Sequence, residues 1–149
     1  MPTAKASLLI RRPPRAVFDA FARADTITHF WLTSTSGPLA PGAVVNWEFM
    51  VPGAKETVTV MDFDVGRHIA FTWSSGMTVE MLFEPYRGDA THVSVTVSAF
   101  EEKDLLAQVA NVVEGFSIVL CDLKTLLEQG RSASLVRDKA ELIANSMER

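Results

Sequence analysis

Residues 105–130, LLAQVANVVEGFSIVLCDLKTLLEQG, decide the fold because they predict one long amphipathic helix. Apolar residues recur along one face of this helix at intervals of three and four, and Gly130 is suited to end it. A helix with such a face must bury it against another layer of the protein. The face consists of Leu105, Val109, Val112, Val113, Phe116, Leu120, Leu123 and Leu127.

The layer that covers this helix is predicted by the segment before it, in which the period of the apolar residues is two. Val45, Trp47 and Phe49 alternate with polar residues, a pattern typical of a half-buried strand. Connections as short as those in this segment exclude parallel crossovers, so the strands form an antiparallel meander. Turn signals divide the segment into strands near 44–51, 56–64, 67–74, 77–84 and 90–98.

The residues before the meander predict a first strand and two small helices. The strand covers 3–10 and is followed by Pro13 and Pro14, which cannot donate to a sheet. Apolar residues at helical spacing predict one small helix at 15–23 and a second short one just after it, whereas 33–42 has the composition of a loop. We therefore expect an α+β fold in which a curved six-stranded antiparallel sheet wraps round the long C-terminal helix.

The chain length suits a single domain with one core. We assign residues 1–130 to this domain and 131–149 to a C-terminal helical extension, with its helix at 132–147. An isolated helix of this length is marginal in water, so we expect the extension to pack on the body or on a partner subunit.

Charge and composition exclude several classes of protein. A net charge of −4 gives no basic field for a phosphate backbone, so nucleic acid is not an expected partner. Cys121 is the only cysteine, which excludes an intrachain disulfide. Uninterrupted apolar runs stay far short of the roughly 20 residues that span a bilayer. We therefore expect a cytoplasmic protein without a membrane span.

Local motifs add a family resemblance to this pattern. They are PRAVFDAFARADTITHFW at 14–31, Pro41-Gly42 followed by Trp47, Thr72-Trp73, and EGFSIVLCDLKTLLEQG at 114–130. Together they resemble the activator of heat-shock protein 90 ATPase homologue family, within the START-like (SRPBCC) helix-grip superfamily.

The resemblance covers about residues 5–130 and implies a helix-grip fold. The family commonly has Gly-Trp where this chain has Gly115-Phe116, which keeps an aromatic ring at the position. Since folds of this kind host unrelated activities, the resemblance leaves the function open.

An apolar cavity between helix, sheet and small helices is the candidate binding site that the resemblance implies. Such cavities take small molecules, and flexible methionine side chains adapt to varied ligand shapes. The same aromatic and methionine residues also serve as ordinary core residues, which is the alternative at each position. The proposed ligand-binding residues are Phe30, Trp31, Trp47, Trp73, Met77, Met81 and Phe116.

Catalytic groups are not brought together by any spacing in the sequence. His29, His68 and His92 are scattered, and Asp62-Phe-Asp64 is typical of a strand edge that runs into a turn. We therefore predict no catalytic residue, no metal and no cofactor.

Three functions remain in order of preference. The first is binding of a small hydrophobic or amphipathic ligand, released by movement of the 33–42 loop. The second is a protein-interaction role, with a homodimer or a chaperone as partner. The third is an enzyme of the polyketide cyclase type, which the superfamily permits.

Overall fold

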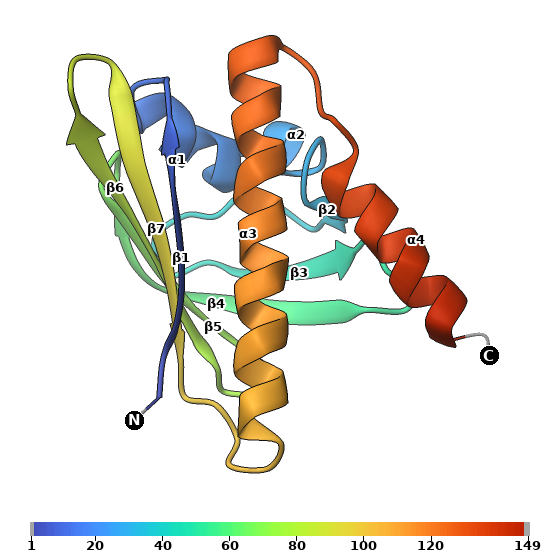
Figure 1. The fold of residues 1–149 in the computed structure, drawn as a ribbon. Coiled ribbons are helices and arrows are strands. Elements are labelled where there is room, and N and C mark those ends of the chain that lie inside the picture. The colour runs from blue at the N-terminus through green and yellow to red at the C-terminus, as the bar shows by residue number, and fades with distance from the viewer. Residues whose placement is uncertain (1, 148–149) are drawn as a thin grey trace.

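The computed structural model describes residues 2–147 and shows one curved antiparallel sheet wrapped round a long helix (Figure 1). The sheet has seven strands in the order β1-β7-β6-β5-β4-β3-β2. They are β1 (Ala4–Ile10), β2 (Leu32–Thr35), β3 (Val44–Phe49), β4 (Lys55–Asp64), β5 (His68–Trp73), β6 (Thr78–Tyr86) and β7 (Ala90–Ser98). The helices are α1 (Pro14–Ala22), α2 (Ala24–Ile27), α3 (Leu105–Gln129) and α4 (Leu135–Met147). The predicted α+β helix-grip class is confirmed.

The predicted count of six strands was wrong, because the structure has a seventh strand, β2. Most of β2 lies in the segment 33–42, which was predicted to be a loop. This strand pairs with β3 through a register shift between Leu32 and Ser34. Only Leu32 among its four residues is fully buried, so the strand shows no apolar alternation. A short, polar edge strand of this kind carries no period-two signal.

The two small helices connect opposite edges of the sheet, since β1 and β2 are its two outermost strands. Pro14 begins α1, where its missing N–H costs nothing and its fixed backbone angle suits the helix. Phe18 and Phe21 then pack against Phe83 of β6, with ring centroids 5.4 Å and 6.1 Å away. These aromatic contacts fix α1 on the concave side of the sheet.

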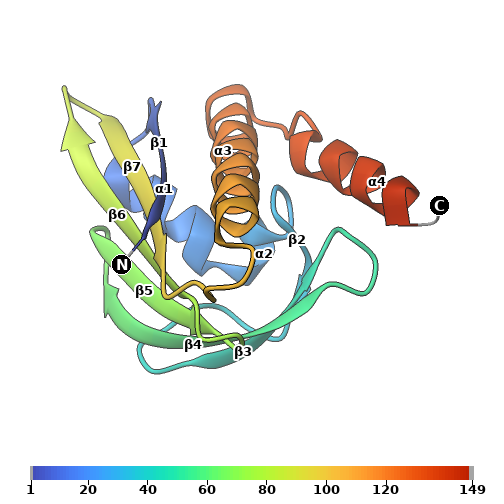
Figure 2. The same ribbon diagram turned by 60° about the horizontal axis from the view of Figure 1, so that its bottom comes forward.

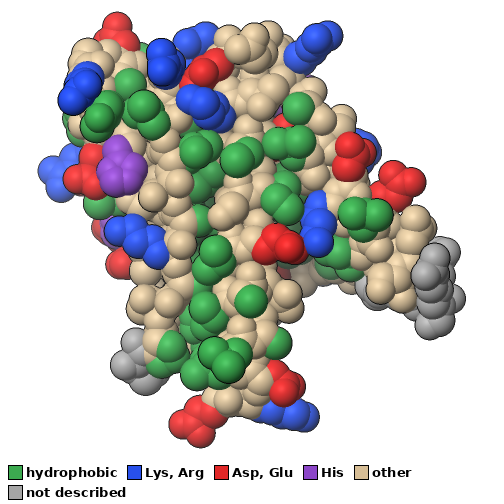
Figure 3. Space-filling model, viewed as in Figure 1, with side chains coloured by type: hydrophobic (Ala, Val, Ile, Leu, Met, Phe, Trp, Pro, Cys, Tyr) green, Lys and Arg blue, Asp and Glu red, His purple; other side chains and the backbone are tan. Residues whose placement is uncertain are grey.

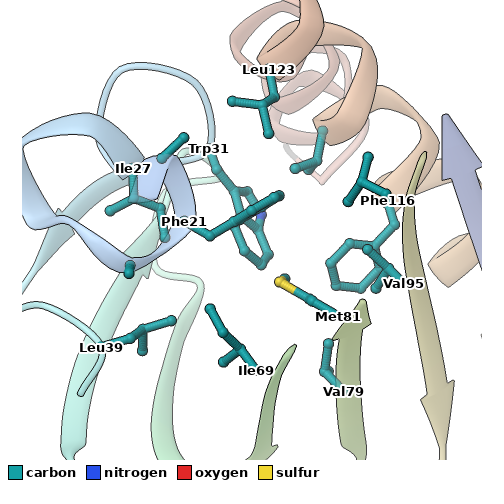
Figure 4. Packing of buried hydrophobic residues seen from close by; sticks show 14 of the residues in the cluster. Phe21, Ile27, Trp31, Leu39, Ile69, Val79, Met81, Val95, Phe116 and Leu123 are labelled. Atoms are coloured by element: carbon teal, nitrogen blue, oxygen red, sulfur yellow. The ribbon is translucent and has the colours of Figure 1, made fainter. Parts of the chain in front are cut away.

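The core lies between α3 and this concave side (Figure 2). Figure 4 shows Phe21, Trp31, Met81 and Phe116 converging there, beneath Leu123 of α3. By length and composition α3 could cross a membrane, but it lies on the sheet with Leu123 completely buried. The sheet therefore buries the part of the α3 apolar face around Leu123.

The connection from α3 to α4 folds back over a buried acid. Gly130 ends α3 with a φ of 83°, a backbone conformation that suits glycine. The Asp122 carboxylate is 1% exposed and accepts hydrogen bonds from the Ser132 hydroxyl at 2.8 Å and the Ala133 N–H at 3.0 Å. These two bonds hold the start of the extension against α3.

In the structure α4 lies beside α3 (Figure 1). Val136 packs against the core, and Ala140 is 6% exposed. The side chain of Met147 lies outside the described residues. Residue 1 and residues 148–149 of the assigned domains also lie outside them.

Candidate functional site

A cavity of about 330 Å³ lies between α3, α4 and the hairpin that joins β3 to β4. Its volume is near the lower end of the range of small-molecule sites, roughly 300–1,000 Å³. It is lined by Trp31, Phe49, Met50, Val51, Ala54, Trp73, Asn111, Val112, Gly115, Phe116, Ile118, Val119, Val136, Lys139, Ala140 and Ile143.

Four aromatic rings of this lining form a closed circuit. Phe116 is 5.5 Å from Trp31 and stacks on Trp73 at 6.1 Å with an angle of 10° between the rings. Phe49 completes the circuit, 6.2 Å from Trp31 and 6.3 Å from Trp73. Trp31 and Phe116 are buried, whereas Phe49 and Trp73 are partly exposed. The circuit gives the cavity a rigid aromatic wall.

Few polar groups reach the cavity. Lys139 of α4 is the only charged side chain among the described lining residues, and its Nζ lies 2.8 Å from Glu114 Oε1. Asn111 adds an amide. The Trp73 Nε1–H is shielded from solvent and finds no acceptor among the described residues. A buried donor without a partner costs about 1–3 kcal/mol.

The residues predicted from the sequence to bind a ligand divide between the cavity and the core. Trp31, Trp73 and Phe116 line the cavity. Phe30, Trp47 and Met81 are at most 1% exposed within the core, and Met77 packs against the core from the β5–β6 turn. Side chains fill the space between α3 and the middle of the sheet, which is where the sequence interpretation had placed the cavity.

The segment 33–42, predicted to act as the moving loop, contributes no lining residue. Backbone hydrogen bonds hold the middle of this segment to its neighbours. The Ser36 N–H donates to the Asn46 carbonyl at 2.9 Å, and the Leu39 N–H donates to the Ala22 carbonyl at 2.9 Å. Leu39 is also buried.

Sequence reasoning missed the walls supplied by α4 and the β3–β4 hairpin. Four lining residues come from α4, namely Val136, Lys139, Ala140 and Ile143, and four come from the hairpin end, namely Phe49, Met50, Val51 and Ala54. The available signal was the apolar character of α3 outside its main stripe, where Ile118 now lines the cavity. That signal showed that something covers α3 but did not identify which segment.

The histidines lie outside the cavity. His29 is exposed, and His92 lies on β7. His68 Nδ1 lies 2.5 Å from Asp62 Oδ2, and its Nε2 lies 3.8 Å from Glu80 Oε1. Within residues 2–147, no group of three histidine, cysteine, aspartate or glutamate side chains has an arrangement that could hold a metal ion.

Perturbed acids also lie outside the cavity lining. A hydrogen bond from Arg23 lowers the pKa of Asp25 to about 2. For Glu128, burial raises the pKa, but the Arg11 backbone N–H and Lys124 outweigh it, so the net pKa is below the ordinary 4.5. Glu128 Oε2 accepts from Arg11 at 2.8 Å and from Lys124 at 2.6 Å. Glu128 and Lys124 thus join α3 to the end of β1, where Lys124 also donates to the Leu9 carbonyl, and they have a structural role.

Comparison with known proteins supports the resemblance noted from the motifs. Residues 11–128 match the family model described as Activator of Hsp90 ATPase homolog 1-like protein. No curated protein matches the chain.

Solved structures share the fold over most of the chain. A protein from Staphylococcus saprophyticus is 25% identical with a TM-score of 0.78, covering 88% of this chain and 95% of its own. The Aha1 dimer from Colwellia psychrerythraea is 19% identical with a TM-score of 0.77, and the match covers 89% of this chain and 100% of the Aha1 chain. CalU16 from Micromonospora echinospora is 16% identical with a TM-score of 0.70, and the match covers 96% of this chain and 86% of the CalU16 chain.

Proposed function

This chain belongs to the Activator of Hsp90 ATPase homolog 1-like protein family, and we propose that it binds a small hydrophobic or amphipathic ligand in the cavity between α3, α4 and the β3–β4 hairpin. The observation that carries the proposal is the closed circuit of four aromatic rings on the wall of a 330 Å³ cavity. Concave, mostly apolar sites with a few polar groups are typical of small-molecule binding. The proposed setting is the cytoplasm.

Ligand entry is assigned to α4 rather than to the 33–42 segment. The α4 wall is joined to α3 by the short connection at 130–134, and its principal polar anchor is Asp122. An element held by few contacts opens at a lower free energy than a core element. Movement of α4 away from α3 would widen the cavity without breaking the sheet.

Gly115 allows a direct test because it lines the cavity on α3 and a Cβ placed there meets no atom within 4 Å. The first carbon of a Gly115→Leu side chain therefore fits, and we expect the rest of the side chain to occupy cavity space. Removing glycine from a helix interior also favours the helix by about 1 kcal/mol. We expect the variant to be at least as stable as the parent and to lose binding of a neutral apolar probe, N-phenyl-1-naphthylamine, measured by its fluorescence.

Two control variants separate cavity filling from general effects on α3. Gly115→Ala stabilises the helix in the same way but leaves most of the cavity empty. This variant should still bind the probe. Ser117→Leu places the same side chain at an exposed position of α3 that does not line the cavity, and should also bind. Undiminished probe binding by Gly115→Leu would refute the proposed site.

A protein-interaction role is the second candidate, favoured by large apolar side chains on the surface. Leu106 on α3 is 87% exposed and Leu142 on α4 is 66% exposed. Figure 3 shows apolar side chains gathered along the long helix. The proposed partner is a second copy of the chain, with a chaperone as the alternative. Sedimentation of the parent, of Leu142→Glu and of a chain without 131–149 tests this, and identical monomeric behaviour of all three would exclude the homodimer.

A further inference from the structure

We propose that the cavity selects a ligand with a flat aromatic body and an anionic end, and that Lys139 of α4 recognises the anion. This inference rests on the proposed function and specifies the chemistry of its ligand. It starts from the uneven distribution of charge around the cavity, in which the described lining carries one cation and no acid.

The apolar part of the cavity suits an aromatic body. The four rings of the wall are separated by 5.5–6.3 Å between neighbouring centroids. Aromatic pairs at such separations contribute favourably beyond the area that they bury. A flat ring system inserted beside them gains these contacts with several rings at once.

The charged part of the cavity lies at its α4 wall. Lys139 and Ala140 are consecutive lining residues of this wall, and Ala140 is buried. A lysine stem can lie along apolar surface while its charge stays in water. The Lys139 side chain is 36% exposed, so it stays partly open to solvent while lining the cavity.

Glu114 forms an ion pair with the Lys139 ammonium group, and this pair is partly exposed to solvent. The Glu114 side chain is 55% exposed, and it does not line the cavity. An ion pair this exposed contributes little, so exchanging Glu114 for a ligand carboxylate is inexpensive. The Glu114–Lys139 pair thus competes with the ligand and keeps the cation positioned when the cavity is empty.

The proposed anion recognition depends on a residue outside the segment that matches the family model. The family match ends at residue 128, whereas Lys139 lies on α4 beyond it. The proposed ligand preference therefore depends on the C-terminal extension of this chain.

The test compares 2-naphthoate with its neutral isostere 2-naphthamide by isothermal titration calorimetry. The parent protein should bind naphthoate more tightly than naphthamide, and added salt should reduce the difference. Lys139→Met should weaken naphthoate about three- to fivefold, the range expected for one partly exposed charge pair, and leave naphthamide unchanged.

Two further variants distinguish charge recognition from a structural role of the side chain. Lys139→Arg keeps the cation and should keep the preference for naphthoate. Glu114→Gln removes the competitor and should strengthen naphthoate binding about twofold without changing naphthamide. Equal binding of both compounds by the parent, unaltered in Lys139→Met, would overturn the inference and leave the proposed function standing. Failure of the parent to bind either compound would overturn both.

Discussion

The two halves of α3 differ sharply in how they are covered. In the C-terminal half, Leu120 and Leu123 are at most 1% exposed and belong to the core against the sheet. In the N-terminal half, every residue from 105 to 115 is at least partly exposed, and the cavity opens beside it. One continuous apolar stripe therefore closes a core at one end and borders a cavity at the other. The apolar stripe in the sequence requires that other elements cover α3. How much of the stripe they bury depends on which elements pack beside each half.

The largest expected effect comes from truncating the closed half. Leu123→Ala removes a fully buried side chain and should lower the free energy of unfolding by about 2–5 kcal/mol. Val112→Ala removes a partly buried side chain that already borders the cavity, so its loss should be about 1 kcal/mol. Urea denaturation measures both, and equal losses would show that the two halves are packed alike.

A smaller effect is expected where the start of the α4 extension is anchored to α3. Asp122→Ala removes the acceptor of the Ser132 and Ala133 hydrogen bonds and should cost about 1–3 kcal/mol. Hydrogen exchange should accelerate in α4 and remain unchanged in the central strands. Glu141→Ala, at an exposed position of α4, is the matched control. Uniform acceleration across the whole chain in the Asp122 variant would mean that the acid supports the core and not the α4 wall.

The smallest effect concerns acid sensitivity at the closed half. Because native contacts lower the pKa of Glu128, its contribution to stability is present above the ordinary value of 4.5 and is lost as the pH falls through the native pKa. Glu128→Gln should cost about 1 kcal/mol at pH 7 and should unfold with a weaker pH dependence between pH 5 and pH 3. An unchanged pH profile would show that Glu128 has no part in acid unfolding.

Periodicity was sufficient to predict the main elements of the fold. The α3 stripe, the alternation in β3 and the glycine-containing turns each follow from local physical rules, and all of them agree with the structure. The strand β2 was not predicted, because its residues show no apolar alternation. It is a strand because it pairs with β3.

The candidate site was less predictable because it depends on contacts between segments far apart in the chain. Trp31, Trp73 and Phe116 could be proposed as apolar residues of a helix-grip fold. Met81 has the same character but lies in the closed core. Lys139 reaches the cavity only because α4 packs beside α3, and no period in the sequence specifies that packing.

Native mass spectrometry of gently purified parent protein and of Gly115→Leu, followed by denaturing extraction, tests the central claim most directly. The account predicts that a small molecule travels with the parent and is absent from Gly115→Leu, while both proteins remain folded. Extraction of the same molecule in equal amounts from both proteins, or its absence from both, would contradict a ligand site between α3, α4 and the β3–β4 hairpin.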